Sequence, residues 1–308
     1  MAEILTVTLN PTIDIFSEAD VVRPTRKTRT ANTRHSPGGG GINVARVIAS
    51  LGGDAEAVFL AGGEIGSLLD RLLGEEGIRR HPIPIVGQTR IGYIVREKST
   101  GLEYRFVPTG PTVHSHELQP CFQTIESHRG SYVVASGSLP EGVPMDTYAR
   151  IAGIAASRGA RFILDSSGTG LQTTLEKSKV FLVKPSLGEL ERLVGRKLNE
   201  ADASQAAAGI VARGAAEFVA VTLGADGALL ASSSGVVRLP AIHVRVRSAV
   251  GAGDSFLGAM IWALSEHKTP EEAFRLGLAA GAAKATTPGT QLCHRADIFD
   301  LYRRAGGV

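Results

Sequence analysis

Cysteine, long apolar runs and excess charge are all scarce in this chain, and each scarcity excludes a class of protein. The only two cysteines, Cys121 and Cys293, lack the spacing of a zinc site or a disulfide framework, so we expect a reducing, cytoplasmic location. No apolar run approaches the roughly 18 residues of a membrane helix, and the first residues carry no signal-peptide pattern. A formal net charge of +3 is too small to indicate nucleic-acid binding. We therefore expect neither a nucleic-acid nor a membrane partner.

The order of the predicted elements indicates an α/β fold. Apolar, β-rich runs alternate with alanine-rich stretches of helical period. Such alternation is typical of a doubly wound, mostly parallel sheet flanked by helices, which binds ligands at the carboxyl ends of its strands. The predicted strands are Ile4–Leu9, Ala57–Ala61, Ser131–Ser136, Phe162–Asp165, Val180–Lys184 and Phe218–Leu223, and the predicted helices are Ile42–Leu51, Ser67–Glu76, Met145–Ser157, Leu187–Val194 and Ala203–Arg213.

Two segments, residues 13–36 and 87–109, interrupt this alternation. They contain no convincing helix, and apolar and polar residues alternate in them, as at Ile91, Tyr93 and Val95. We expect them to form a small β-sheet lid over the strand ends, while residues 1–12, 37–86 and 110–308 form the α/β core. Edge hairpins that extend the main sheet are the alternative.

Glycine is abundant, and one glycine cluster surrounds an aspartate near the C-terminal end. The segment reads Val250-Gly251-Ala252-Gly253-Asp254-Ser255-Phe256 and leads into an apolar helical run. Glycines let the backbone approach a ligand closely, and free N–H groups at a helix start attract anions. A carboxylate there suits proton abstraction from a hydroxyl that attacks a phosphate, but Asp is also a common helix cap. The local sequence leaves both roles of Asp254 open.

A second cluster, Gly38-Gly39-Gly40-Gly41, also precedes a predicted helix and brings Asn43 into its first turn. Its spacing differs from the G-x-G-x-x-G of dinucleotide-binding proteins, and the chain contains no G-x-x-x-x-G-K-[ST] loop, which excludes a Walker-type phosphate site. We expect this backbone to approach a ligand, with a flexible turn as the alternative.

Further polar residues lie where predicted strands end. Arg90 and Arg105 lie within residues 87–109, and a guanidinium suits a phosphate through paired hydrogen bonds. Each group taken alone also fits a surface or capping role. Asp14 could accept hydrogen bonds from a polyol, and Lys184, Ser186 and Glu189 could serve a nucleotide and its Mg²⁺. Ser138 follows one predicted strand, and Thr222, Gly224 and Gly227 lie in the glycine turn after the last one.

Together these motifs resemble the ribokinase-type (PfkB) family of carbohydrate kinases, and within it the 6-phosphofructokinases. The resemblance rests on the pairing of Gly38–Ala45 with Gly251–Asp254 and extends from Thr8 to Thr290. It implies a ribokinase-like fold and a homodimer formed through the lids. The motifs that point to hexose-phosphate kinases are Thr89-Arg90, Tyr104-Arg105-Phe106, Ser136-Gly137-Ser138-Leu139-Pro140 and Asp165-Ser166-Ser167-Gly168.

The resemblance also implies a role for each candidate residue. Asp254 would be the base that accepts the proton of the sugar hydroxyl, and Gly251, Ala252 and Gly253 would donate N–H groups to the transferring phosphoryl group. The sugar phosphate would contact Asp14, Gly38, Gly39, Gly40, Asn43, Arg90, Arg105 and Ser138; ATP would contact Lys184, Ser186, Glu189, Thr222, Gly224 and Gly227; Glu189 would hold Mg²⁺ through water; and Ser248, Val250 and Gly289 would surround K⁺.

Three residues depart from the family pattern. Ser186 replaces the Asn of the family's Asn-x-x-Glu motif, which bears on the affinity for Mg²⁺ and ATP. Lys284 and Gln291 lie near the monovalent-cation loop, where relatives carry a small residue and Arg. The charge of Lys284 would either substitute for a bound K⁺ or repel it.

The expected function is that of an ATP-dependent kinase that converts fructose 6-phosphate to fructose 1,6-bisphosphate. Tagatose 6-phosphate and fructose 1-phosphate remain open as acceptors, because two arginines suit any sugar phosphate. A non-catalytic metabolite sensor of the same fold is the alternative from a different class, and the departure at Ser186 is its only support.

Overall fold

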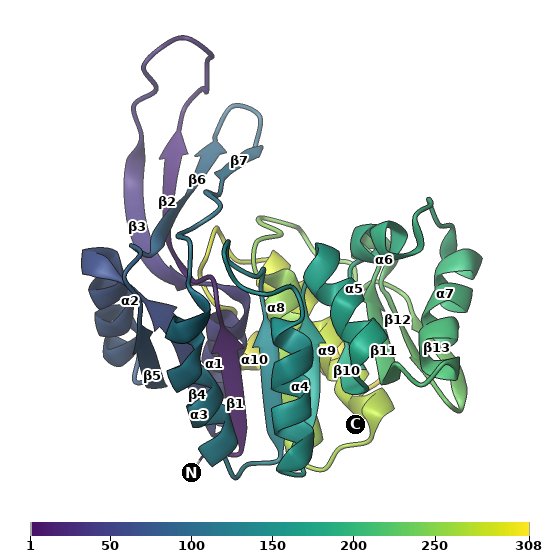
Figure 1. Cartoon of the computed structure of the whole chain (residues 1–308). Helices are drawn as coiled ribbons and strands as arrows, with labels where there is room; N and C mark the ends of the chain where they lie inside the picture. Colours follow the sequence, from purple (N-terminus) through teal and green to yellow (C-terminus); the bar gives the residue numbers. More distant parts are fainter. Residues whose placement is uncertain (1, 308) are drawn as a thin grey trace.

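The computed structural model describes residues 2–307, and its strands form two separate sheets (Figure 1). The larger sheet has nine strands in the order β13-β12-β11-β10-β9-β8-β1-β4-β5. All neighbouring pairs are parallel except β11/β12 and β12/β13. The strands are β1 (Ile4–Thr8), β4 (Ala55–Ala61), β5 (Arg79–Pro84), β8 (Tyr132–Ser136), β9 (Arg161–Asp165), β10 (Val180–Val183), β11 (Ala216–Thr222), β12 (Ala228–Ser232) and β13 (Gly235–Leu239).

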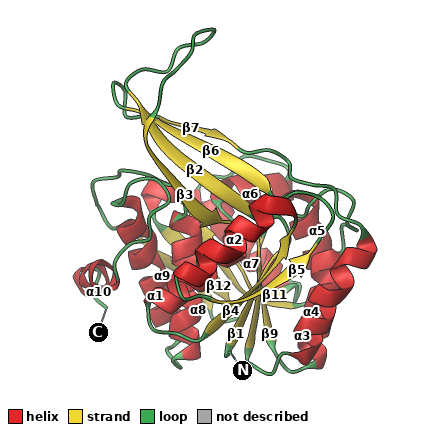
Figure 2. Ribbon diagram, turned by 90° about the vertical axis from the view of Figure 1, so that its left-hand side faces the viewer, coloured by secondary structure: helices red, strands yellow, loops and turns green. Residues whose placement is uncertain are grey.

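Helices cover both faces of this sheet and create two cores (Figure 2). Successive strand residues point to opposite faces, so Ile4 belongs to one core and Leu5 to the other. One core is completed by α1 (Gly40–Ser50), α2 (Gly63–Glu75), α8 (Ala252–Ser265), α9 (Pro270–Ala285) and α10 (Arg295–Arg304). The other is completed by α3 (Gln119–Ser127), α4 (Thr147–Ser157), α5 (Gly168–Lys177), α6 (Leu187–Val194) and α7 (Glu200–Ala212). This is the predicted α/β architecture.

The smaller sheet has four strands in the order β3-β2-β6-β7 and projects beyond the main sheet (Figure 1). Its strands are β2 (Thr12–Ala19), β3 (Ala31–Gly38), β6 (Arg90–Glu97) and β7 (Glu103–Phe106). Because this sheet pairs with no strand of the larger one, the alternative of edge hairpins is wrong. Phe16 and Ile94 of the small sheet pack against Val250, just before α8. The predicted domain boundaries at residues 13–36 and 87–109 stay a prediction.

Several elements lie where the sequence predicted none. Strand β5 reads Arg-Arg-His-Pro-Ile-Pro and lies at the edge of the sheet, where proline is tolerated because one side of the strand has no partner. Helix α5 contains two glycines and three threonines, which have low helix propensity, and it is stabilised by packing of Leu171 and Leu175. Among the helices of residues 2–307, none is long and apolar enough to cross a bilayer.

Candidate active site

Helix α8 begins in the glycine cluster and leaves N–H groups available at its start. Gly251 is the N-terminal cap residue, with a left-handed φ of 76° that favours glycine. The N–H groups of Gly251 and Gly253 make no hydrogen bond within the described chain, whereas that of Ala252 donates to the carbonyl of Ala249 at 3.3 Å. The helix start therefore offers donors to an anion, with Ala252 the least free of the three predicted residues.

Asp254 lies in the first turn of α8, but its carboxylate does not cap the helix. The capping alternative is therefore wrong. Its Oδ2 instead accepts a hydrogen bond from Nδ2 of Asn43 at 2.8 Å, across 211 positions of the sequence. Burial raises the pKa of Asp254, and the Asn43 bond and the Lys184 charge oppose this. A buried carboxylate with a raised pKa that accepts one amide hydrogen bond has the properties of a general base.

Asn43 is placed by the four-glycine cluster, which brings α1 against the strand ends. A Cβ at Gly40 would lie 2.1 Å from Oγ of Ser136, and one at Gly41 would lie 2.6 Å from Oγ1 of Thr8. The cluster thus allows close approach of two protein segments. Gly38 faces Asp14 in the same way and does not line the cleft described next, unlike Gly39 and Gly40.

A polar cleft of about 280 Å³ lies between the lid and the carboxyl ends of the strands. The fold gathers in it many of the residues predicted for a sugar phosphate, together with Asp254. Its lining includes Asp14, Gly39, Gly40, Asn43, Arg90, Arg105, Ser138, Glu189, Gly251 and Asp254. These residues come from both sheets, so the cleft exists only in the folded chain.

Two arginines and Asp14 lie on the lid side of this cleft, and Asp165, Glu189 and Asp254 add carboxylates to its lining. Arg90 donates to the carbonyls of Asn10 and Pro108, each at 2.8 Å, so its guanidinium is fixed at the junction of lid and core. Arg105 is exposed on β7 and lines the same cleft. Burial raises the pKa of Asp14 to about 6, although both guanidinium charges oppose the shift. The arginines therefore suit an anionic group, and the carboxylates suit hydroxyl groups of the same ligand.

A second, mostly apolar cavity of about 460 Å³ lies on the other side of the α8 start. Gly253 and Ala252 line this cavity, whereas Gly251 and Asp254 line the polar cleft. The predicted nucleotide residues Thr222, Gly224 and Gly227 also line it. Apolar side chains that could hold a planar base come from Ile242, Val244, Phe256 and Leu278. The anion-binding backbone thus separates two cavities of different chemistry.

Lys184 lies buried beside this backbone. Its Nζ is 3.1 Å from Asp165 Oδ1, and a Cβ at Gly253 would lie 3.4 Å from that Nζ. Burial raises the pKa of Asp165 to about 6 against the opposing charge of Lys184. Burial alone would lower the pKa of Lys184, but Asp165 reverses the shift, so the lysine is held charged.

Ser186 and Glu189 form a reciprocal cap at the start of α6. Oγ and the N–H of Ser186 donate to Oε2 of Glu189 at 2.8 and 2.7 Å, and the Glu189 N–H donates back to Oγ at 3.3 Å. Glu189 nevertheless lines the polar cleft. Within residues 2–307 no group of three His, Cys, Asp or Glu side chains is arranged to hold a metal. A Mg²⁺ ion here would therefore take most of its ligands from phosphate and water, as is usual for this ion.

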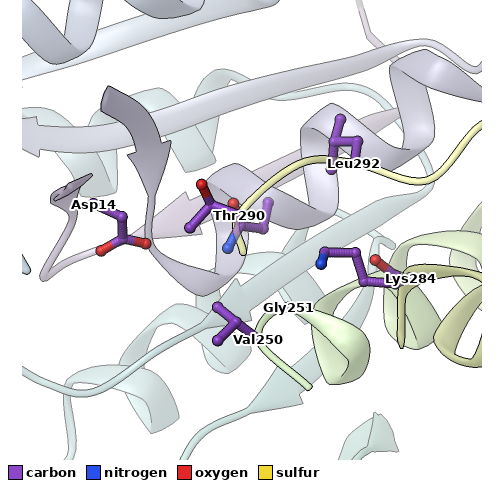
Figure 3. A pocket seen from close by; sticks show the side chains of 8 residues that line it. Asp14, Val250, Gly251, Lys284, Thr290 and Leu292 are labelled. Carbon is purple, nitrogen blue, oxygen red and sulfur yellow. The ribbon is translucent and has the colours of Figure 1, made fainter. Parts of the chain in front are cut away.

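Of the residues predicted around K⁺, Val250 lines a small cavity that Lys284 also lines (Figure 3). Nζ of Lys284 donates to the carbonyl of Gly289 at 2.9 Å. Oγ of Ser248 donates to Glu103 on the lid strand β7 at 2.8 Å, and Val250 packs against the lid.

Sequence reasoning assigned no role in the site to three residues that organise it. Asp165 lines the polar cleft. Its position at the end of a predicted strand was the feature that could have identified it as a site residue. Nε of Arg46 lies 2.6 Å from Oε2 of Glu76, and its Nη1 lies 3.4 Å from Oδ1 of Asn43. A single arginine within an apolar helical pattern does not indicate a site residue. The amide of Asn10 donates to Ser138 and to the carbonyl of Thr109, which ties the lid junction to the core.

Comparison with known proteins defines the class to which this fold and site belong. The family model for the pfkB family carbohydrate kinases matches residues 7–297. The chain therefore belongs to the PfkB family of carbohydrate kinases. The predictions of family, of a ribokinase-like fold and of a phosphotransferase are confirmed.

Particular relatives place the chain more narrowly. It is 45% identical, over 98% of its length and 89% of the relative's, to the ATP-dependent 6-phosphofructokinase isozyme 2 of Mycobacterium tuberculosis. It is 39% identical to the Escherichia coli isozyme 2, with 98% of both chains covered. A crystal structure of Escherichia coli phosphofructokinase-2 in complex with potassium has a TM-score of 0.95, at 38% identity over 99% of this chain and 100% of that one.

Proposed function

We propose that this chain is an ATP-dependent 6-phosphofructokinase that transfers a phosphoryl group to the 1-hydroxyl of fructose 6-phosphate. One observation carries the proposal. Asp254, bonded to Asn43, lies where the α8 start separates a cleft with two arginines from an apolar cavity. A sugar phosphate in the cleft and a nucleotide in the cavity would meet at this helix start. The resemblance to relatives named 6-phosphofructokinase supports the choice of acceptor.

In this proposal Asp254 removes the proton of the attacking hydroxyl. Its raised pKa makes it a stronger base than an exposed aspartate, and the Asn43 bond fixes its orientation. The N–H groups of Gly251 and Gly253 stabilise the charge that develops on the transferring phosphoryl group. Lys184 adds a fixed positive charge beside them, because Asp165 keeps it protonated.

The arginines of the cleft recognise the phosphate that the sugar already carries. Arg105 is free to form paired hydrogen bonds with phosphate oxygens, while Arg90 contributes from the lid junction and Ser138 from the core. Asp14, Asn43 and the backbone of Gly39 and Gly40 face the sugar hydroxyls. Gly38 does not contact the sugar in this assignment, and it affects the site only by allowing its neighbours to pack closely.

The nucleotide occupies the apolar cavity in this assignment. Thr222, Gly224 and Gly227 contact the base and ribose, and Ser186 supports Glu189 through their reciprocal cap. Glu189 would hold Mg²⁺ through water. When bound, Mg²⁺ would neutralise charge on the phosphates of ATP.

The test is a coupled ADP-release assay across fructose 6-phosphate, tagatose 6-phosphate, fructose 1-phosphate, fructose and ribose. We expect kcat/KM for fructose 6-phosphate to exceed that for each other sugar by about tenfold or more. Arg105→Ala should raise KM for fructose 6-phosphate by about 10- to 100-fold and leave KM for ATP within about twofold. Arg158→Ala, which changes an exposed arginine outside both cavities, is the matched control.

Each alternative has its own outcome in this assay. Highest turnover with tagatose 6-phosphate or fructose 1-phosphate would reassign the acceptor. Sugar binding without ADP release would support the metabolite sensor. Equal losses for ATP and sugar in Arg105→Ala would contradict the phosphate role of this arginine.

A further inference from the structure

The cation-binding region of this chain departs from what a bound K⁺ requires. The resemblance assigns Ser248, Val250 and Gly289 to a monovalent cation, and a related phosphofructokinase-2 was solved with potassium. Such an ion is held when protein oxygens replace its hydration shell. Here the carbonyl of Gly289 already accepts a hydrogen bond from Nζ of Lys284 at 2.9 Å, so one expected ligand has a cationic partner.

The space left beside Lys284 is small. A cavity of about 20 Å³ lies beside the ammonium group, between the α8 start and the loop that follows α9 (Figure 3). A cavity of this size holds about one water molecule. In Figure 3 the side chain of Lys284 points into the space between Gly251 and Thr290. The ammonium group of Lys284 therefore lies in the space where the resemblance places the cation.

The surroundings of Lys284 are those of a buried cation. The side chain is only 2% exposed. Burial lowers the pKa of this lysine, while the charges of Cys293, Glu103 and Asp254 oppose the shift. Oε1 of Glu103 is buried and makes no hydrogen bond within the described chain, although its other oxygen accepts from Ser248. The charge of Glu103 favours the protonated form of Lys284 without a direct ion pair.

Lys284 also lies close to the anion-binding backbone. Its Cε lies 3.5 Å from where a Cβ at Gly251 would stand. The C-terminal end of α9 holds the loop before α8, because the N–H of Arg247 donates to the carbonyl of Ala285 at 2.7 Å. The carbonyl of Lys284 itself accepts from Thr287. Lys284 thus bonds the loop after α9, and the neighbouring residue Ala285 bonds the loop before α8.

We propose that the ammonium group of Lys284 is a tethered replacement for the monovalent cation, so that this enzyme works without K⁺. An ammonium group and K⁺ carry the same charge, and both interact with carbonyl oxygens. A free cation entering beside Lys284 would be repelled by it at short range in a poorly screened site. The polypeptide therefore supplies permanently what a relative takes from solution.

The first test uses the unmodified protein. Its Tm and its initial ADP-release rate are measured while K⁺ replaces tetramethylammonium at constant ionic strength, up to about 100 mM. We expect no K⁺-specific rise in Tm and a rate change of less than about twofold. A saturable rise of either quantity with K⁺ would overturn the proposal.

The second test removes the ammonium group in two ways. Lys284→Ala opens the space, so K⁺ should restore a lowered rate by about tenfold or more and raise Tm, and tetramethylammonium should do neither. Lys284→Met fills the space without charge and should stay insensitive to K⁺. A Lys284→Ala protein that folds and ignores K⁺ would overturn the proposal. If this variant does not fold, the unmodified protein still decides the question.

The rate measurements rest on the proposed function, but the Tm measurements need no sugar and no ATP. A protein that phosphorylates no sugar on the panel, yet shows the expected Tm pattern, would contradict only the proposed function. A K⁺-activated 6-phosphofructokinase would contradict only the cation proposal.

Discussion

Asp254 combines two features that the local sequence could not separate. It lies at a helix start, where a carboxylate is stabilised by the free N–H groups, but its side chain bonds to Asn43 instead of capping α8. The bond partner comes from the other end of the chain. At the residue scale, the candidate base is therefore set apart from an ordinary cap by one hydrogen bond.

Asp254→Asn should lower kcat by about 10²- to 10⁴-fold, or about 3–5 kcal/mol of activation free energy. The asparagine can still accept the bond from Asn43, so Tm and both KM values should change little. Steady-state kinetics with thermal unfolding measure these quantities. Asp297→Asn is the matched control, because Asp297 also lies in the first turn of a helix, α10, but is exposed. Near-normal kcat in Asp254→Asn would remove this residue from catalysis.

At the scale of elements, the site depends on how α1 is held. The guanidinium of Arg46 is buried and bonds Glu76, at the end of α2, through two nitrogens at 2.6 and 2.8 Å. The same group donates to the carbonyl of Pro37 at 3.2 Å and to Oδ1 of Asn43 at 3.4 Å. One side chain thus ties α1 to α2 and to the end of β3, and it orients the amide that bonds Asp254.

Arg46→Met should lower the free energy of unfolding by about 1–3 kcal/mol, because Glu76 and the Pro37 carbonyl lose their donor. The loss should stay below that of a fully buried pair, since 34% of the Glu76 side chain is exposed. We also expect kcat to fall, because the amide of Asn43 is no longer held. Urea unfolding and steady-state kinetics measure both effects.

Arg71→Met is the control for this prediction. Arg71 pairs with Glu75 on the exposed face of α2, and such pairs contribute about 0–0.5 kcal/mol. Equal changes in the two variants would show that the buried contacts of Arg46 do not position the site.

At the scale of the whole molecule, the lid exposes an apolar surface. Tyr93 and Phe106 face each other across β6 and β7 and are 46% and 59% exposed. Leu102 and Val107 of the same segment are also exposed. Exposed apolar side chains grouped on one sheet are typical of an interaction surface. This supports the predicted homodimer through the lids; a related phosphofructokinase-2 is described as tetrameric in its inhibited form.

We expect the protein to sediment as a dimer at micromolar concentration and Tyr93→Asp to sediment as a monomer. A charge buried without a partner at the interface would weaken association by about 2 kcal/mol or more. Met145→Asp, an exposed apolar residue just before α4, is the control and should remain dimeric. Sedimentation velocity distinguishes these outcomes. A monomeric unmodified protein, or a dimeric Tyr93→Asp, would contradict the lid interface.

The sequence by itself determined the α/β class and the alternation of most strands and helices, and it predicted where the phosphate chemistry lies. Apolar period and glycine clusters are local signals, so β1, β8 and the α8 start could be predicted from neighbouring residues alone. Strand β5 and helix α5 could not, because prolines, glycines and threonines oppose them locally and packing overrides that preference.

Only the tertiary structure decided which of these residues act together. The bond from Asn43 to Asp254 joins segments 211 positions apart, and the contact of Lys284 with Gly289 depends on how a loop folds back on α9. Sequence predicted that Lys284 would either replace K⁺ or repel it. The position of its ammonium group favours replacement. The sequence could not decide this, because hydrogen bonds and buried charges depend on distances that no local pattern encodes.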